Sequence, residues 1–134
     1  MLTRGRLAKA VGCNSETIRY YEKVGLLPEP PRSESGYRLY DKNHLRILRF
    51  IQRAKSLGFS SGRIRELLAL SAVGARHTRS EVKSLTESHI KEVSEKIKDL
   101  QQLKKRLDQI SSHCDGSDQS AESCPILISL FDGK

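Results

Sequence analysis

The stretch "TIRYYEKVGLLPEPPRSESGYRLY", residues 17–40, decides the fold, because its first half has a helical pattern and its second half cannot be helical. Ile18 and Tyr21 lie at helical spacing, with Leu26 a turn further on, and Gly25 predicts where the helix ends. Residues 28–36 then contain three prolines, two serines and a glycine, which exclude a helix interior. The pattern predicts a helix followed by a two-stranded hairpin, or wing, with "SESG" at its tip.

A second short helix is predicted just before this stretch. Thr3 can cap a helix that runs through Val11, in which the apolar residues have helical spacing. The "GCNS" segment then interrupts the chain, and Ser15 is expected to cap the helix that follows. Two short helices joined by a tight turn that contains glycine indicate a helix-turn-helix.

The helical period returns after the wing. Asp41 is a suitable cap for a helix that ends at Gly58, and Ser60 or Ser61 can begin another, "SSGRIRELLAL". Residues 81–112 form one long amphipathic helix of about 48 Å. Its apolar seam comprises Val82, Leu85, Val93, Ile97, Leu100, Leu103, Leu107 and Ile110, with His89 among them. A helix of this length extends beyond a small core, which favours a coiled-coil dimer over packing against its own domain.

The charge of the 134-residue chain is unevenly distributed. The net charge is +8, and residues 1–75 hold 14 Lys and Arg against six acidic residues, whereas the remainder is balanced. The first half is therefore expected to meet a polyanion, with a merely solubilising surface as the alternative. The start of the chain has no secretory pattern and no apolar run approaches a membrane span, so we expect a cytoplasmic protein without membrane contact.

Residues 17–68 resemble the DNA-binding half of the MerR family of transcriptional regulators. The resemblance rests on "TIRYYE" followed by "GLL", on the wing tip from Arg32 to Gly36, on "GYRLY", and on "LGFS" before another helix. It implies a homodimer with a winged helix-turn-helix, an antiparallel pair of long helices and a C-terminal effector site. The fold is then mainly α, with a DNA-binding domain in residues 1–75, a linker and dimerisation helix in 76–112, and a metal-binding loop with a short helix in 113–134.

The candidate DNA contacts lie on the second helix and on the wing. Glu16 and Thr17 near the helix start are placed to touch bases in the major groove, and Arg19 can reach a phosphate or a guanine edge. Tyr37 and Arg38 suit phosphate contacts. By resemblance, Arg19, Tyr21, Arg32, Tyr37 and Arg38 match family positions that contact DNA. The full set expected at the DNA is Ser15, Glu16, Thr17, Arg19, Tyr21, Arg32, Tyr37 and Arg38.

Two of the three cysteines form a candidate metal site. Nine residues, three of them acidic and none basic, separate Cys114 from Cys124. A reducing compartment disfavours a permanent disulfide, and thiolates select Cu(I) and its heavier congeners, or Zn(II), Cd(II) and Hg(II). Pro125 suits the first position of a short helix, whose N-terminus would stabilise a Cys124 thiolate. Cys13, in the helix-turn-helix, is expected to be a small packed residue.

The resemblance narrows the range of metal ions to consider, because a paired-cysteine loop at this place is typical of the metal-sensing branch of the family. Members for divalent ions are expected to add a third cysteine from the start of the partner's long helix. That region here, residues 75–83, offers His77, Thr78 and Ser80 but no cysteine. Two thiolates suit a monovalent ion, so the copper-, silver- and gold-responsive branch, with Cu(I), Ag(I) or Au(I), is expected.

Two alternatives stay open. The loop length is closer to that of zinc-responsive members, and His113 or His77, with loop acids Asp115, Asp118 or Glu122, could complete a site for Zn(II) or for Cd(II), Hg(II) or Pb(II). A disulfide between Cys114 and Cys124 would instead make the regulator responsive to redox state.

The resemblance also implies a mechanism. The protein would bind a palindromic promoter as a homodimer, repress transcription when metal-free, and distort the DNA on metal binding so that RNA polymerase engages the promoter. The sequence contains no GxGxxG, P-loop or CxxC pattern, so an enzyme is not expected. A purely architectural DNA-binding protein is a further alternative.

Overall fold

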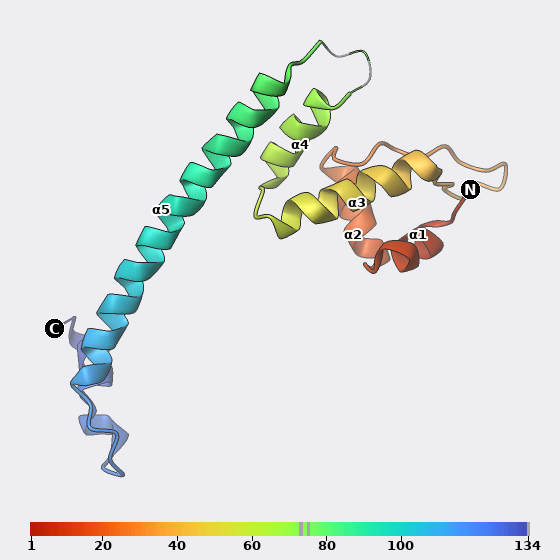
Figure 1. Cartoon of the computed structure of the whole chain (residues 1–134). Coiled ribbons are helices and arrows are strands. Elements are labelled where there is room, and N and C mark those ends of the chain that lie inside the picture. Colours follow the sequence, from red (N-terminus) through yellow and green to blue (C-terminus); the bar gives the residue numbers. More distant parts are fainter. Residues whose placement is uncertain (73, 75, 134) are drawn as a thin grey trace. The chain divides into compact units, whose positions relative to one another are not determined.

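The structure is a computed structural model of the chain, and it describes residues 1–72, 74 and 76–133 (Figure 1). Its elements in order are α1 (Arg4–Val11), α2 (Ser15–Lys23), α3 (Lys42–Ser56), α4 (Ser61–Leu70), α5 (Arg79–Ser112), the 3-10 turn η1 (Ala121–Ser123) and α6 (Pro125–Asp132). The predicted mainly α class is confirmed. The chain divides into two compact units, Met1–Lys83 and Ser84–Lys134. The domain boundary predicted at residue 75 lies outside the described residues.

The helix-turn-helix begins with two local caps. The Thr3 hydroxyl oxygen accepts a hydrogen bond from the Arg6 amide at 3.3 Å, as predicted for the start of α1. The start of α2 differs from the prediction, because Asn14 and not Ser15 is the cap. The Asn14 side-chain oxygen accepts from the Thr17 amide at 2.8 Å, and Asn14 has the extended backbone of a cap (φ −99°, ψ 164°). Ser15 is already the first helical residue, so its own amide is one of the donors that a cap leaves exposed.

Replacing Asn14 with alanine is expected to lower the free energy of unfolding by about 1 kcal/mol, because one orphan amide at the start of α2 loses its acceptor. The matched variant Ser15→Ala should change it by less than about 0.5 kcal/mol. Urea denaturation of the full chain compares the two. Equal losses in both variants would mean that the cap is shared between the two residues.

The wing is a turn with short arms. The predicted "SESG" tip is present: the Gly36 amide donates to the Ser33 carbonyl at 2.9 Å, and Gly36 has a φ of 85° that glycine adopts without strain. The predicted pair of strands is reduced to one isolated bridge, between Arg32 and Arg38, and no strand occurs among the described residues. The three prolines that precede the tip explain this, since they cannot donate to a ladder.

The core of the first unit comes from α1, α2, α3, α4 and the segments between them. Helix α1 packs on α2 and α3, and α3 packs on α4. The buried apolar residues are Leu7, Ala8, Ile18, Tyr21, Leu26, Leu27, Tyr40, Leu48, Ile51, Ala54, Phe59 and Ile64. Asp41 caps α3 as predicted. It forms a capping box with His44, in which each side chain accepts a hydrogen bond from the backbone amide of the other residue. Gly25 and Gly58 follow the ends of α2 and α3 with φ near 80°, which confirms both predicted helix ends.

Helix α5 is 34 residues long and matches the predicted long helix to within two residues at its start. Most of the predicted apolar seam is 40 to 63% exposed in the single chain: Val82, Val93, Ile97, Leu100, Leu103 and Leu107. Ile90, which was not predicted in the seam, is also 58% exposed. Helix α6 begins at Pro125 as predicted and also exposes apolar residues, of which Phe131 is the most accessible. Within the described ranges, no helix combines the length and the apolar character needed to cross a membrane.

Candidate nucleic-acid interface and metal site

A basic groove on the first unit gathers residues from α1, α2 and the wing. The groove has a volume of about 530 Å³, and four arginines line it: Arg4, Arg19, Arg32 and Arg38. Thr3, Gly5, Gly36 and Tyr37 complete the lining. Guanidinium groups that converge from three segments suit the phosphates of a nucleic-acid backbone.

One buried carboxylate, that of Glu22, contacts residues that line the groove. The Glu22 side chain is 6% exposed, and its Oε2 accepts a hydrogen bond from Arg38 Nη1 at 2.9 Å. The Tyr40 hydroxyl donates to Glu22 Oε1, and Arg4 Nε donates to the Tyr40 hydroxyl at 3.3 Å. Burial raises the pKa of the Tyr40 phenol, and the adjacent Glu22 carboxylate raises it further. Helix α2, helix α1 and the wing are therefore joined by one polar network.

Several predicted DNA-contacting residues face solvent. The Arg19 side chain is 59% exposed, and its guanidinium stands 3.7 Å from the Glu16 carboxylate. Tyr37 is exposed at the wing, and Arg32 Nη1 donates to the Gly36 carbonyl at 3.1 Å, which places its charge beside the wing tip. The structure thus brings Arg19, Arg32, Tyr37 and Arg38 to one groove.

Three predicted residues are placed differently. Tyr21 is only 8% exposed and belongs to the core, whereas Tyr20 is 50% exposed. The DNA contact of Tyr21 stays a prediction. The Thr17 hydroxyl donates to the Asn14 side chain at 2.8 Å, so it takes part in the helix cap. Ser15 is half-buried as the first residue of α2.

Arg4 is a groove residue that the sequence analysis missed. Its basic side chain at a helix start was a weak signal. Its pairing with Tyr40, 36 positions away, comes from the fold, because the isolated bridge between Leu2 and Tyr40 brings the N-terminus beside the end of the wing.

The two predicted metal-binding cysteines meet in the second unit. Cys114 follows α5 and Cys124 is the cap residue of α6, and their sulfur atoms lie 3.4 Å apart as free thiols. The loop between them is held by local turns: Asp115 Oδ1 accepts from the Ser117 amide at 2.9 Å and the Ser120 hydroxyl accepts from the Glu122 amide at 3.3 Å. These local turns bring the two thiols together.

The distance between the two sulfur atoms can be compared with the distances that different metal coordination geometries require. With a metal–sulfur bond of about 2.3 Å, two sulfurs of a tetrahedral site lie roughly 3.8 Å apart and two sulfurs on opposite sides of an ion about 4.6 Å apart. The observed 3.4 Å is closer to the tetrahedral spacing. Two thiols so arranged fit part of a soft-metal site.

The remaining ligands of a tetrahedral ion are not assembled. No group of three or more His, Cys, Asp or Glu side chains arranged to hold a metal occurs in the part of the chain that the structure describes. His113 and Asp115 line the same cavity, of about 430 Å³, as Cys114 and Cys124. His77, the other predicted ligand, has its Nδ1 at 2.5 Å from the Glu81 carboxylate.

The pKa values of Cys124 and Cys13 are shifted in opposite directions. The Cys114 thiol and then the Ile126 backbone amide, both hydrogen-bonding to Cys124, lower the pKa of that thiol. Burial raises the pKa of the Cys13 thiol. A lowered pKa leaves more thiolate at a given pH.

Iodoacetamide is therefore expected to modify Cys124 faster than Cys13 in the reduced, metal-free protein, and the difference should persist as the pH falls from 8 towards 6.5. Peptide mass spectrometry after timed quenching measures both rates in one sample. Equal rates at every pH would contradict the assigned shifts.

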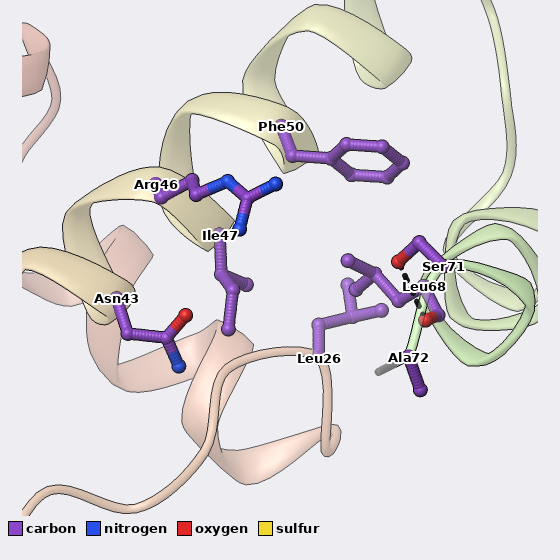
Figure 2. A pocket seen from close by; sticks show the side chains of 8 residues that line it. All are labelled: Leu26, Asn43, Arg46, Ile47, Phe50, Leu68, Ser71 and Ala72. Atoms are coloured by element: carbon purple, nitrogen blue, oxygen red, sulfur yellow. Dashed lines mark hydrogen bonds between the residues drawn. The ribbon is translucent and has the colours of Figure 1, made fainter. Parts of the chain in front are cut away.

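A second cavity of the first unit lies apart from these predicted sites. It encloses about 420 Å³ between the residues that follow α2, helix α3 and the end of α4 (Figure 2). Its lining comprises Leu26, Asn43, Arg46, Ile47, Phe50, Leu68, Ser71 and Ala72. None of these belongs to the predicted DNA-contacting or metal-binding sets.

The helix-turn-helix, the wing and the basic groove define a DNA-binding protein of the winged helix-turn-helix class. The model of the MerR HTH family regulatory proteins matches residues 2–71, and the model described as MerR, DNA binding matches residues 45–110. The chain belongs to the MerR family, which confirms the family resemblance.

Relatives and solved structures agree with this assignment. The chain is 40% identical to the heavy metal-dependent transcription regulator 2 of Rhizobium meliloti, over 96% of this chain and 86% of that protein. The lead(II) complex of the transcription regulator PbrR691 from Ralstonia metallidurans is 39% identical, with a TM-score of 0.82 over 97% of this chain and 99% of that one. HiNmlR, a MerR family regulator bound to promoter DNA, is 29% identical, with a TM-score of 0.57 over 84% of each chain. These proteins are regulators, which supports the expectation of a non-enzyme.

The comparisons do not support the narrower expectation of the copper, silver and gold branch. The relatives are named for heavy metals or solved with lead(II), so they favour the divalent alternative. The absence of a third cysteine does not exclude a divalent ion, because its other ligands need not be sulfur.

Proposed function

We propose that this protein is a metal-responsive transcriptional regulator that binds a palindromic promoter as a homodimer and responds to a soft divalent ion at Cys114 and Cys124. The observation that carries the proposal is the pairing, in one family member, of a four-arginine groove with two thiols 3.4 Å apart. A regulator that acts on promoter DNA and RNA polymerase would work in the cytoplasm.

The DNA-binding part of the proposal rests on exposure and charge. Helix α2 presents Glu16 and Arg19 to solvent, while Ile18 and Tyr21 anchor its other face in the core. A helix held in this way can enter the major groove with its outer residues at the bases. The groove arginines and Tyr37 would then lie along the adjacent phosphates.

The dimer is supported by the exposed seam of α5. Seven apolar side chains spaced mainly by three or four residues leave a continuous stripe, which a single chain exposes to water. We infer that a second copy covers this stripe in an antiparallel coiled coil, as the family resemblance implies. Two half-sites of a palindrome would then be read by the two basic units.

The choice of a divalent ion is supported by two facts. The sulfur separation is closer to tetrahedral than to linear coordination, and the similar proteins are named for heavy metals or lead(II). Cys114 and Cys124 would supply two thiolates, and His113, in the same cavity, is the proposed further ligand. A bound ion would supply a positive charge that links the two thiolates.

A transcriptional response to the metal requires that metal binding changes the shape of the promoter DNA. Cys114 lies two residues beyond the end of α5 and Cys124 is the cap residue of α6, so a link between them would hold α6 near the end of the long helix. The differential contacts that α6 then makes are the proposed source of the energy that distorts the promoter, with repression in the metal-free state and activation in the loaded one.

In-vitro transcription from the protein's own promoter, under strict reduction, tests the metal. Buffered Zn(II), Cd(II), Pb(II), Cu(I) and Ag(I) are titrated separately. Activation by one or more of the divalent ions and not by Cu(I) or Ag(I) is expected. Activation by Cu(I) and Ag(I) alone would restore the monovalent assignment, and activation by an oxidant without metal would favour the redox alternative.

Substituting the proposed third ligand tests the composition of the site. His113→Ala is expected to weaken Zn(II) or Cd(II) binding by about 10- to 100-fold, because an ion loses one nitrogen ligand. His77→Ala should leave the affinity within about twofold, since the Glu81 carboxylate already engages the His77 ring. Competition with a chromophoric chelator measures both affinities. The reverse order would make His77, and not His113, the third ligand.

A further inference from the structure

We propose that Glu22 is a positioning residue for DNA recognition. It holds the wing against α2, the helix proposed to enter the major groove, so that the two contact DNA as one surface. The inference rests on the proposed DNA binding and goes beyond it, because Glu22 itself would touch neither bases nor phosphates. It names the group that sets the geometry of the groove arginines.

The contacts of Glu22 are divided between the two oxygens of its carboxylate. Oε2 accepts from Arg38 Nη1 at 2.9 Å and lies 3.8 Å from Arg4 Nη2. Oε1 accepts from the hydroxyl of Tyr40, a residue that is fully buried. A single carboxylate on α2 thus fixes a residue of the first helix and two residues of the wing.

The burial of the Glu22 side chain means that its hydrogen bonds fix the orientation of their donors. The Glu22 side chain is 6% exposed, against 19% for Arg4 and 25% for Arg38. A charged acceptor with so little access to water depends on its hydrogen-bond donors, and charge-assisted bonds fix the orientation of the planar guanidinium. Arg38 uses one of its five N–H donors on Glu22, which leaves others for the groove that it lines.

The negative charge of Glu22 makes it possible to tell a positioning role from a purely electrostatic effect on DNA binding. A carboxylate beside the groove opposes the approach of any phosphate, so it reduces non-specific binding. If Glu22 also orders the wing, it strengthens binding to the operator. Removing its charge should therefore move the two affinities in different directions, whereas a merely structural loss would weaken both.

Glu22→Gln in the full-length protein tests this inference. The probes are the duplex palindrome that the unchanged protein selects from a random pool and a scrambled duplex of the same length. We expect operator binding to weaken about tenfold while binding to the scrambled duplex stays equal or tightens. A parallel loss on both duplexes, or an unchanged ratio, would overturn the positioning role. Failure of the unchanged protein to select any palindrome would instead overturn the proposed function.

Two further variants make the result specific. Glu29→Gln removes the same charge from an exposed position of the same unit, and it should leave the operator-to-scrambled ratio within about twofold. Tyr40→Phe deletes only the hydroxyl between Arg4 and Glu22 and should lower the ratio by about threefold. If circular dichroism shows that Glu22→Gln does not fold, the Tyr40→Phe ratio decides the question, and an unchanged ratio there overturns the inference.

Discussion

Replacing both Cys114 and Cys124 with serine is expected to abolish the metal response of transcription and to leave operator binding within about twofold of the unchanged protein. Both sulfurs belong to the second unit and line one cavity there, whereas the groove arginines belong to the first. Serine keeps the size of the side chain but replaces a soft thiolate with a hard hydroxyl, which soft metal ions bind poorly. The expected effect is thus a loss of induction at every metal concentration.

Cys13→Ser is the matched control for this double variant. Cys13 is half-buried in the helix-turn-helix, and its substitution should retain induction. Transcription assays and metal-binding stoichiometry are measured on the same preparations. Induction that persists in the double variant would place the effector elsewhere, and induction lost in Cys13→Ser would implicate the DNA-binding unit in sensing.

Leu100→Glu is expected to dissociate the dimer and to weaken operator binding by at least about 100-fold. Leu100 lies in the middle of the exposed seam of α5, with 63% of its side chain accessible in the single chain. In the proposed coiled coil this position would be buried, so two glutamates would enter the interface without partners. A monomer then loses the advantage of holding two half-sites at once.

Gln102→Glu is the control that adds the same charge on the opposite side of the helix. At 100° per residue, position 102 faces away from positions 97, 100 and 103, so the dimer should persist. Glutamate favours helix, and both variants should therefore retain the helical circular dichroism signal. Sedimentation equilibrium gives the oligomeric state. A Leu100→Glu protein that remains dimeric would show that the seam of α5 is not the interface.

Local patterns accounted for most of the helical elements. The caps at Thr3 and Asp41 and the glycines that follow α2 and α3 were predicted because each depends on residues within one or two turns. The long helix followed from the period of its apolar residues. Even the meeting of Cys114 and Cys124 could be predicted, since a short loop keeps their sulfurs close.

Competing local choices were harder to predict. Asn14 and Ser15 are both good caps, and the backbone angles of the turn decided for Asn14. Tyr20 and Tyr21 are adjacent aromatics; helical spacing favoured Tyr21 as the inward-facing one, and the packing of α2 buries it. The choice of metal stays open for a related reason, because coordination depends on the spacing and number of all donors and not on the cysteines alone.

The sequence by itself determined the family, the order of the helices and the two candidate sites, because short-range periodicity, caps and motif residues specify them. The tertiary structure alone decided how the groove is held. Arg4, Glu22, Arg38 and Tyr40 are separated by up to 36 positions and meet only because α1, α2 and the wing pack around one core. A buried carboxylate must find its donors within hydrogen-bond distance, and no local pattern in the chain specifies such a long-range meeting.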